Sequence, residues 1–288
     1  MSDSPTTDGT KAGRAVPAAK TPKAGRNLPA AIGVGVGLGA LVIASLAIRR
    51  EAFLVILVIA MAIGAWEMRR AVRQAGIEVP LVPVVIGAAS MVLSAYFRGP
   101  EALFLTFGLT CVGVLVWRVA DGLDGAIRDI GGALFVVLYP CFLGGFAALL
   151  LAADDGHWRM VFFVLVVVFS DIGGYAFGVV LGKHPMAPSL SPKKSWEGFA
   201  GSVFSCAVVG GIAITTVLDG PWWKGAVIGV VVAAAATVGD LIESSIKRDL
   251  GVKDMGTLLP GHGGLMDRLD SLVVCVPVVW ALLLWATP

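Results

Sequence analysis

IGGALFVVLYPCFLGGFAALLLAA, residues 130–153, contains no charged side chain and no alternation of polar and apolar positions. A run of about 20 mostly apolar residues is the length that a helix needs to cross a hydrocarbon core of roughly 30 Å. Because every backbone polar group in that core must be satisfied within the protein, such an uninterrupted run indicates a helix. The segment therefore predicts a transmembrane helix.

The rest of the chain has the same character. Hydrophobic side chains make up 57% of its 288 residues, charged side chains make up 15%, and the mean hydropathy is +0.86. Soluble domains carry about 25% charged residues. The sequence therefore predicts an all-α polytopic membrane protein of about nine transmembrane helices. We expect these helices at approximately 29–48, 51–67, 79–97, 101–117, 130–153, 159–182, 197–217, 224–243 and 269–287.

The predicted helices divide the chain into three parts. Residues 1–28 are rich in Ala, Pro, Thr, Lys and Gly, which predicts a disordered cytoplasmic tail with nothing to bury. Residues 29–153 hold about five N-terminal transmembrane helices. Residues 154–288 form a C-terminal transmembrane region, whose loops contain the polar segments discussed next.

Lysine and arginine residues are distributed unevenly between the two sides of these spans. The N-terminal tail and every second loop hold 17 of the 22. Because cytoplasmic loops carry an excess of positive residues, we place the N-terminus in the cytoplasm and the C-terminus outside. The protein is expected to be a multi-pass protein of the cell membrane.

The first polar patch lies inside the sixth predicted span. Asp171 falls near its middle, where a carboxylate costs about 3 kcal/mol and should face a polar cavity or a partner. Asp171, Tyr175 and Gly178 share one helical face. Gly174, Gly178 and Gly182 recur every four residues, a spacing that lets another helix or a ligand approach the backbone. For the glycines, helix packing alone remains an alternative.

The second patch is SLSPKKSWEGF, residues 189–199. Ser195 is suited to cap the helix that starts after it, and Glu197 falls in the favourable first turn. Lys193 and Lys194, just outside a helix N-terminus, create a positive field suited to phosphate oxygens. Contact with anionic lipid headgroups is an alternative role for these lysines.

The third patch begins at the end of the eighth predicted span, where Asp240, Glu243 and Lys247 fall on one helical face. The following segment has too many Gly and Pro residues for regular structure and is predicted to be a loop of defined turns. Asp267 and Asp270 then lie one turn apart at the start of the last helix. Negative side chains are favoured there, so capping is an alternative for one of them.

Together the patches supply carboxylates, lysines, arginines and a flexible Gly-His-Gly-Gly segment. Mg²⁺ is bound through one or two carboxylates plus substrate phosphates. Phosphoryl and nucleotidyl transfer need substrate positioning and neutralisation of charge on the transferring phosphorus, which Mg²⁺ and basic side chains provide. These residues therefore indicate a phosphoryl or nucleotidyl transfer site, without naming the nucleotide or the acceptor.

At these residues the chain resembles the phosphatidate cytidylyltransferases, also called CDP-diacylglycerol synthases. The resemblance is clear from about Asp171 to Asp270 and weak before that. The family's pattern is matched here by Ser244, Ile246, Lys247, Arg248, Lys253, Asp254, Gly256, Leu259, Pro260, His262, Gly263, Gly264, Leu265, Asp267, Arg268, Leu269 and Asp270.

The resemblance implies a reaction in which CTP and phosphatidic acid give CDP-diacylglycerol and pyrophosphate. It implies a requirement for Mg²⁺ and leaves open a second cation. The implied catalytic residues are Asp240, Asp267, Lys247, Arg248 and His262. The implied metal ligands are Asp240, Asp267 and Asp270. The implied substrate-binding residues are Asp171, Ser191, Lys193, Lys194, Ser244, Gly263, Gly264 and Arg268. For His262, a hydrogen-bonding role in the loop is the alternative to donating a proton.

The resemblance also implies that residues 154–288 are the catalytic region, that the active site faces the cytoplasm, and that the partners are CTP, phosphatidic acid and the lipid bilayer. A homodimer is expected, and no nucleic-acid partner. A transporter is the main rival, because an intramembrane aspartate and glycine-broken helices also mark substrate pathways. A related enzyme acting on another lipid is the second rival.

Overall fold

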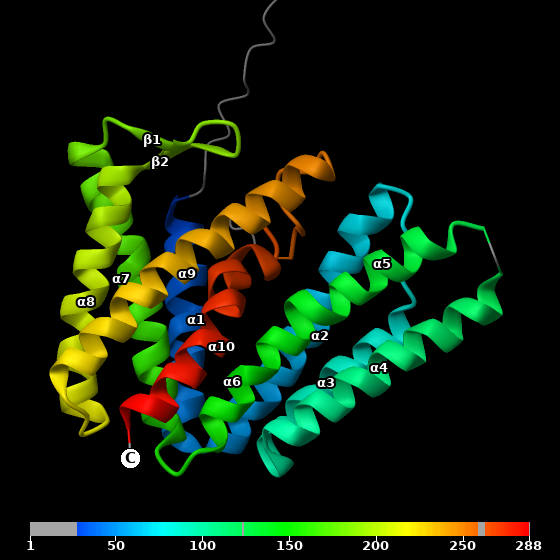
Figure 1. Cartoon of the computed structure of the whole chain (residues 1–288), viewed down its shortest axis with the longest axis horizontal. Helices are drawn as coiled ribbons and strands as arrows, with labels where there is room; N and C mark the ends of the chain where they lie inside the picture. The colour runs from blue at the N-terminus through cyan, green and yellow to red at the C-terminus, as the bar shows by residue number, and fades with distance from the viewer. Residues whose placement is uncertain (1–27, 123, 259–262, 288) are drawn as a thin grey trace, which may run out of the picture.

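The computed structural model describes residues 28–122, 124–258 and 263–287, which are almost entirely helical (Figure 1). The helices run up and down between two ends of the molecule. They are α1 (Leu28–Ile48), α2 (Arg50–Gln74), α3 (Leu81–Arg98), α4 (Pro100–Asp121), α5 (Ala126–Val136), the π-helical segment η1 (Val137–Phe142), α6 (Leu143–Ala152), α7 (Gly156–Leu181), α8 (Trp196–Val217), α9 (Trp222–Asp249) and α10 (Met266–Ala286). This confirms the predicted all-α polytopic fold.

Each predicted span corresponds to a helical segment of the described chain. Within those residues, eight segments are long and apolar enough to cross a membrane, and α5, η1 and α6 together form one of them, Ala126–Ala152. The first predicted span forms α1, in which Gly35–Ile48 is a shorter apolar helix. The exact number of crossings and the side of the N-terminus stay predictions.

Two helices extend well beyond their predicted spans. Helix α2 continues past residue 67 to Gln74, and α9 continues past residue 243 to Asp249. Arg, Lys, Gln and Met in these extensions are good helix formers, and in α9 Glu243 and Lys247 form an i, i+4 ion pair at 2.6 Å. Hydropathy marks the width of the apolar core, whereas a helix ends where its backbone hydrogen bonding ends.

The fifth predicted span is not a uniform α-helix. Residues Val137–Phe142 adopt π-helical geometry, with Pro140 inside the segment. Proline has no N–H to donate and clashes with the preceding turn of an α-helix, and a local π-turn is one way to accommodate it. Tyr139 lies within this segment, and its side chain is buried.

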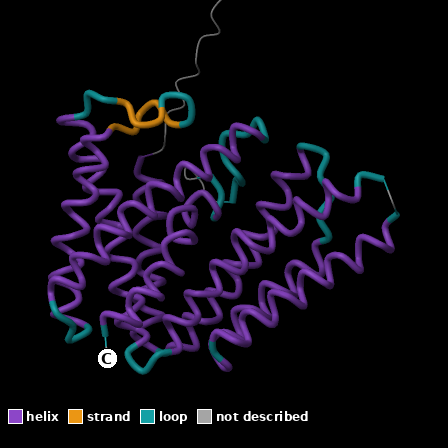
Figure 2. Tube along the Cα trace, in the orientation of Figure 1, coloured by secondary structure: helices purple, strands orange, loops and turns teal. Residues whose placement is uncertain are grey.

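All three polar patches lie at the same end of the molecule. The β-hairpin between α7 and α8 and the connection between α9 and α10 lie at this end, together with the connections that follow α2 and α4 (Figures 1 and 2). The C-terminus lies at the opposite end with the α8–α9 connection. The shared end agrees with the alternating spans predicted from the sequence.

A short antiparallel hairpin joins α7 to α8, where the sequence had suggested only a loop. Strands β1 (Pro185–Ala187) and β2 (Ser191–Ser195) pair with Pro185 opposite Ser195 and Ala187 opposite Ser191. The Ser195 side chain then caps α8 by accepting the Gly198 N–H at 3.1 Å, as predicted.

Glu197 fixes the base of this hairpin. Its carboxylate accepts the backbone N–H groups of Lys183 and His184 at 3.1 and 3.2 Å, and it pairs with His184 Nδ1 at 2.5 Å. The first turn of α8 therefore holds both ends of the hairpin in place.

Helices α7 and α8 pack at backbone distance through glycines. A Cβ atom on Gly173 would lie 2.6 Å from the Gly201 carbonyl oxygen, and one on Gly201 would lie 2.7 Å from the Gly173 carbonyl oxygen. A Cβ atom on Gly174 would lie 2.6 Å from Ser202 Oγ. The predicted close approach of another helix to the glycines of the sixth span is confirmed.

We expect Gly201→Leu to destabilise the fold, because its side chain would meet the backbone of α7. Overpacking of this kind costs about 2 kcal/mol or more. Thermal unfolding of the purified protein in detergent measures the effect. Gly108→Leu on α4 is the matched control, since no atom lies within 4 Å of a Cβ atom placed there. Equal stability of the two variants would contradict the glycine contact.

Candidate active site

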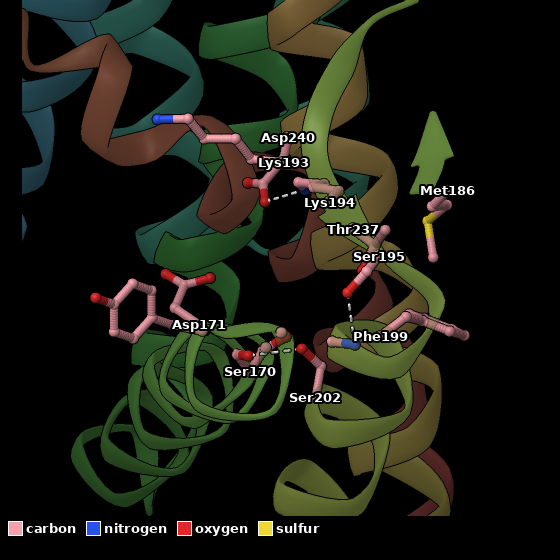
Figure 3. Close-up of a pocket in the computed structure, with 14 residues that line it drawn as sticks. Ser170, Asp171, Met186, Lys193, Lys194, Ser195, Phe199, Ser202, Thr237 and Asp240 are labelled. Carbon is pink, nitrogen blue, oxygen red and sulfur yellow. Dashed lines mark hydrogen bonds and ion pairs between the residues drawn. The ribbon is translucent and has the colours of Figure 1, made fainter. Parts of the chain in front are cut away.

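A cavity of about 230 Å³ opens between α7, the hairpin, α8 and α9 (Figure 3). It brings together Asp171, Lys193, Lys194 and Asp240, which come from three of the elements around it. Its lining also includes Ser170, Gly174, Tyr175, Gly178, Met186, Ser195, Gly198, Phe199, Ser202 and Thr237. The structure thus joins the first two polar patches to the start of the third.

Asp240 and Lys194 form an ion pair across this cavity (Figure 3). Their side chains are 29% and 26% exposed, so the pair is partly open to solvent. A partly exposed ion pair contributes little to stability. An anionic ligand can therefore compete for Lys194, and a cation can compete for Asp240, at a small energetic cost.

Asp171 lies on the α7 wall of the cavity with Gly174, Tyr175 and Gly178. This confirms the predicted shared face of the helix. Among the residues that the structure describes, Asp171 has no hydrogen-bond or ion-pair partner. It lies within electrostatic reach of Asp240. Its carboxylate is thus free to bind a ligand that enters the cavity.

A second polar cluster ties the end of α9 to the start of α10. Lys247 Nζ lies 2.6 Å from Glu243 Oε2 and 2.6 Å from Asp267 Oδ1. The side chains of Lys247, Glu243 and Asp267 are 17%, 6% and 2% exposed. One ammonium group therefore bridges two buried carboxyl groups, and its removal would leave the buried Asp267 carboxylate without its ion-pair partner.

Asp267 also holds the connection between the two helices. Both of its carboxylate oxygens accept the Met255 N–H at 3.0 Å, and Oδ2 accepts the Gly264 N–H at 2.6 Å. Both donors lie before α10, so these contacts hold the loop and are not the helix capping that the sequence offered as an alternative for one of the two aspartates. A metal-binding role for Asp267 stays a prediction.

Asp270, one turn further along α10, adjoins the same cluster, because it lies within electrostatic reach of Glu243. Its Oδ1 accepts the Ser271 N–H at 2.8 Å. Its charge lies within electrostatic reach of Asp171 and Asp240, whereas Asp267 is engaged with Lys247 and the loop. Of the two α10 aspartates, Asp270 is therefore the one whose charge acts on Asp171 and Asp240.

The other predicted site residues lie around these clusters. Ser244 is half-buried and Arg248 is exposed, on either side of Lys247 along α9. Ser191 opens strand β2, and Arg268 is exposed within electrostatic reach of Asp171. Within the described residues, Ser191, Ser244 and Arg248 lie outside the lining of the cavity.

The predicted glycines lie in the loop before α10. Gly263 has a φ of 82°, in the left-handed region that favours glycine. Gly264 is buried and donates its N–H to Asp267. His262 lies outside the described residues.

The carboxylates fit a Mg²⁺ ion that is shared with substrate. Within the described ranges, no three His, Cys, Asp or Glu side chains gather as a protein metal cage. Mg²⁺ does not need such a cage, because one or two carboxylates and substrate phosphates suffice. Asp171 and Asp240 on the cavity wall provide two suitable oxygen ligands.

Glu67 is a buried polar residue near the site that was not predicted from the sequence. This residue of α2 is completely buried, and its Oε2 accepts the Met266 N–H at 2.8 Å. The available signal was a carboxylate at the end of an apolar span, in the segment WEMRR, residues 66–70. That position was consistent with an ordinary interfacial charge, and its partner lies 199 residues away in the chain.

A model of the cytidylyltransferase family matches residues 29–286. The chain belongs to the cytidylyltransferase family. The phosphatidate cytidylyltransferase of Mycobacterium leprae is 40% identical to this cytidylyltransferase over 280 residues, covering 91% of this chain and 89% of that protein. The phosphatidate cytidylyltransferase of Mycobacterium bovis is 38% identical over 281 residues, covering 93% and 92%.

A more distant relative gives a shorter match. The phosphatidate cytidylyltransferase of Brucella suis is 39% identical over 182 residues, covering 61% of this chain and 64% of that protein. The predicted family, and with it the prediction of an enzyme of the nucleotidyltransferase class, is confirmed. The resemblance seen in residues 171–270 extends, in the mycobacterial relatives, along nearly the whole chain.

We expect Lys247→Met to lower the stability of this cytidylyltransferase by about 3 kcal/mol or more, because it leaves the Asp267 carboxylate buried without a counter-charge and removes the hydrogen-bond donor to Glu243. Thermal unfolding in detergent measures the change. Arg248→Met, at the exposed neighbouring position, is the control and should leave stability nearly unchanged. Similar unfolding temperatures for the two variants would show that the buried cluster does not depend on Lys247.

Proposed function

We propose that this cytidylyltransferase transfers CMP from CTP to phosphatidic acid, giving CDP-diacylglycerol and pyrophosphate. The family match and the names of the mycobacterial relatives support CTP-dependent synthesis of CDP-diacylglycerol. The observation that carries the proposal is the cavity itself. It brings Asp171, Asp240 and Lys194 together at one end of a bundle of membrane helices (Figure 3).

In the proposed reaction, a phosphate oxygen of phosphatidic acid attacks the α-phosphorus of CTP. The bond between the α-phosphorus and the oxygen that bridges to the β-phosphorus breaks, and pyrophosphate leaves with the bonding electron pair. No protein side chain needs to form a covalent bond. The protein must hold two anionic phosphates in line and offset their repulsion.

The hairpin and the start of α8 form the positive side of the cavity. Lys193 and Lys194 lie on β2 directly before the α8 N-cap, and the first-turn residues Gly198 and Phe199 line the same space. A helix N-terminus favours anions through its free N–H groups and its dipole. We assign to this side the binding of the CTP phosphates.

The carboxylates form the opposite side and would hold Mg²⁺. Asp171 and Asp240 line the cavity, and Asp270 lies within electrostatic reach of both. When bound, Mg²⁺ would neutralise negative charge on the transferring phosphorus. A second cation stays an expectation from the family resemblance.

A lipid in the bilayer can reach the cavity along its α7 wall. Asp171 is followed on α7 by exposed apolar side chains, those of Ile172, Tyr175 and Val179. Exposed apolar side chains on a membrane helix contact acyl chains. Phosphatidic acid can thus keep its tails in the bilayer while its phosphate reaches the cavity, and CTP can enter from the aqueous end.

We infer that this end faces the cytoplasm of the cell membrane, where CTP is available. The connections that carry most of the lysines and arginines lie at the same end as the cavity, and positive loops favour the cytoplasmic side. A homodimer remains an expectation from the family resemblance.

We expect the purified protein to form CDP-diacylglycerol and pyrophosphate from labelled CTP, phosphatidic acid and Mg²⁺ in detergent. Asp171→Asn and Asp240→Asn should each lower kcat about 100-fold, because each removes a charge that the cation requires. Asp154→Asn makes the same chemical change at an exposed position in the connection between α6 and α7, which lies at the opposite end (Figure 1), and should leave kcat unchanged. Efficient turnover with ATP, or without Mg²⁺, would contradict the proposed reaction.

The orientation can be tested separately with Ser189→Cys, in the exposed turn of the hairpin. A membrane-impermeant maleimide should label this cysteine in inverted membrane vesicles and not in intact cells, because the hairpin is expected to face the cytoplasm. Asp154→Cys, at the opposite end, should show the reverse pattern. Labelling of Ser189→Cys in intact cells would place the cavity on the outer side. The four native cysteines lie within membrane helices, and the unsubstituted protein gives their background.

A further inference from the structure

Glu67 connects the N-terminal helices to the loop before α10. Its side chain is completely buried, and its Oε2 accepts the N–H of Met266, the first residue of α10. One turn before it on α2, Gly64 allows the Met266 side chain to pack closely, with Met266 Sδ 3.5 Å from the position of a Cβ atom. The start of α10 is thus seated directly on α2.

Two glycines of the loop also rest against the Glu67 carboxylate. A Cβ atom on Gly256 would lie 2.2 Å from Glu67 Oε1, and one on Gly264 would lie 2.6 Å from Glu67 Oε2. No other residue type fits at these two positions unless Glu67 moves. The backbone of the loop and the carboxylate therefore fix each other's positions.

Packing alone does not explain a carboxylate at this place. Burial of a charged group is costly, and an apolar side chain of similar size would fill the same volume without that cost. Glu67 Oε1 has no hydrogen-bond partner among the described residues. The useful contact is therefore that of Oε2, which satisfies one of the free N–H groups at the start of a helix and places negative charge at its positive end.

Glu67 and Asp267 hold the same loop from two sides. Asp267 accepts the N–H groups of Met255 and Gly264, and Glu67 accepts that of Met266. Between them, the two carboxylates fix both ends of the segment that leads into α10. The position of the first turns of α10, and hence of Asp270, depends on these contacts.

We propose that Glu67 is a positioning residue for nucleotidyl transfer, which fixes the loop at Gly256 and Gly264, and the start of α10, relative to the cavity. This inference rests on the proposed function for its link to catalysis. It assigns to an N-terminal helix a direct part in a site whose recognisable sequence pattern lies near the C-terminus.

Two substitutions separate positioning from packing. Glu67→Met keeps the volume and removes the hydrogen-bond acceptor, so we expect a thermal stability close to that of the unsubstituted protein and a kcat at least about tenfold lower. Glu67→Gln keeps an acceptor for the Met266 N–H and should restore kcat to within about threefold. Neither change should alter the KM for CTP by more than about threefold, because Glu67 does not line the cavity.

Hydrogen exchange of the backbone amides provides a readout independent of activity. In Glu67→Met, the amides of Met255, Gly264 and Met266 should exchange at least about tenfold faster, and in Glu67→Gln they should stay protected. Leu57→Ala, a buried truncation elsewhere on α2, is the control for lost packing. It should lower thermal stability without exposing these three amides.

The outcomes distinguish the inference from the proposed function. If the unsubstituted protein makes CDP-diacylglycerol and Glu67→Met retains full kcat with protected amides, Glu67 has no positioning role. If Glu67→Met loses kcat only in proportion to lost stability, as Leu57→Ala does, its role is packing. If the loop is released in Glu67→Met but the unsubstituted protein does not act on CTP and phosphatidic acid, the contact stands and the proposed reaction fails.

Discussion

The arrangement of α9, α10 and the loop between them depends on the two ion-pair contacts of the Lys247 ammonium group. This group contacts Glu243 on its own helix and Asp267 on the next, and all three side chains are largely shielded from solvent. Two carboxyl groups buried so close together lack hydration and need a shared hydrogen-bonding partner. With the lysine between them, the end of α9, the following loop and the start of α10 can meet in one place.

In this arrangement the two aspartates of α10 make different contacts. The Asp267 carboxylate binds Lys247 and accepts backbone N–H groups of the loop, and these contacts hold the loop in place. Asp270, one turn later, adds its charge to that of Asp171 and Asp240. The two residues lie three positions apart on one helix and make different contacts, and a metal-binding role for either stays a prediction.

The sequence predicts the parts of this protein that local physical chemistry determines. Apolar runs locate the membrane helices, and the Ser195 cap follows from its position before a helix. The hairpin escaped prediction because Ser191–Ser195 has little strand propensity of its own and depends on pairing with β1. The contact of Glu67 with Met266 escaped because it joins helices that are far apart in the chain. The difference in contacts between Asp267 and Asp270 depends on the path of the loop, which no local pattern specifies.

The glycine contact between α7 and α8 has a consequence for substrate selection. The backbones of these two helices are in contact beside the cavity, at Gly173 and Gly201, so neither helix can move without displacing the other. The side of the cavity formed by α7 and α8 is therefore stiff. On its other side, the hairpin and α9 are joined by the partly solvent-exposed ion pair of Lys194 and Asp240. The hairpin must therefore be the part that adjusts to headgroups or nucleotides of different size. Substitutions in the hairpin should change which unusual substrates are accepted, while the glycine contact between α7 and α8 stays intact.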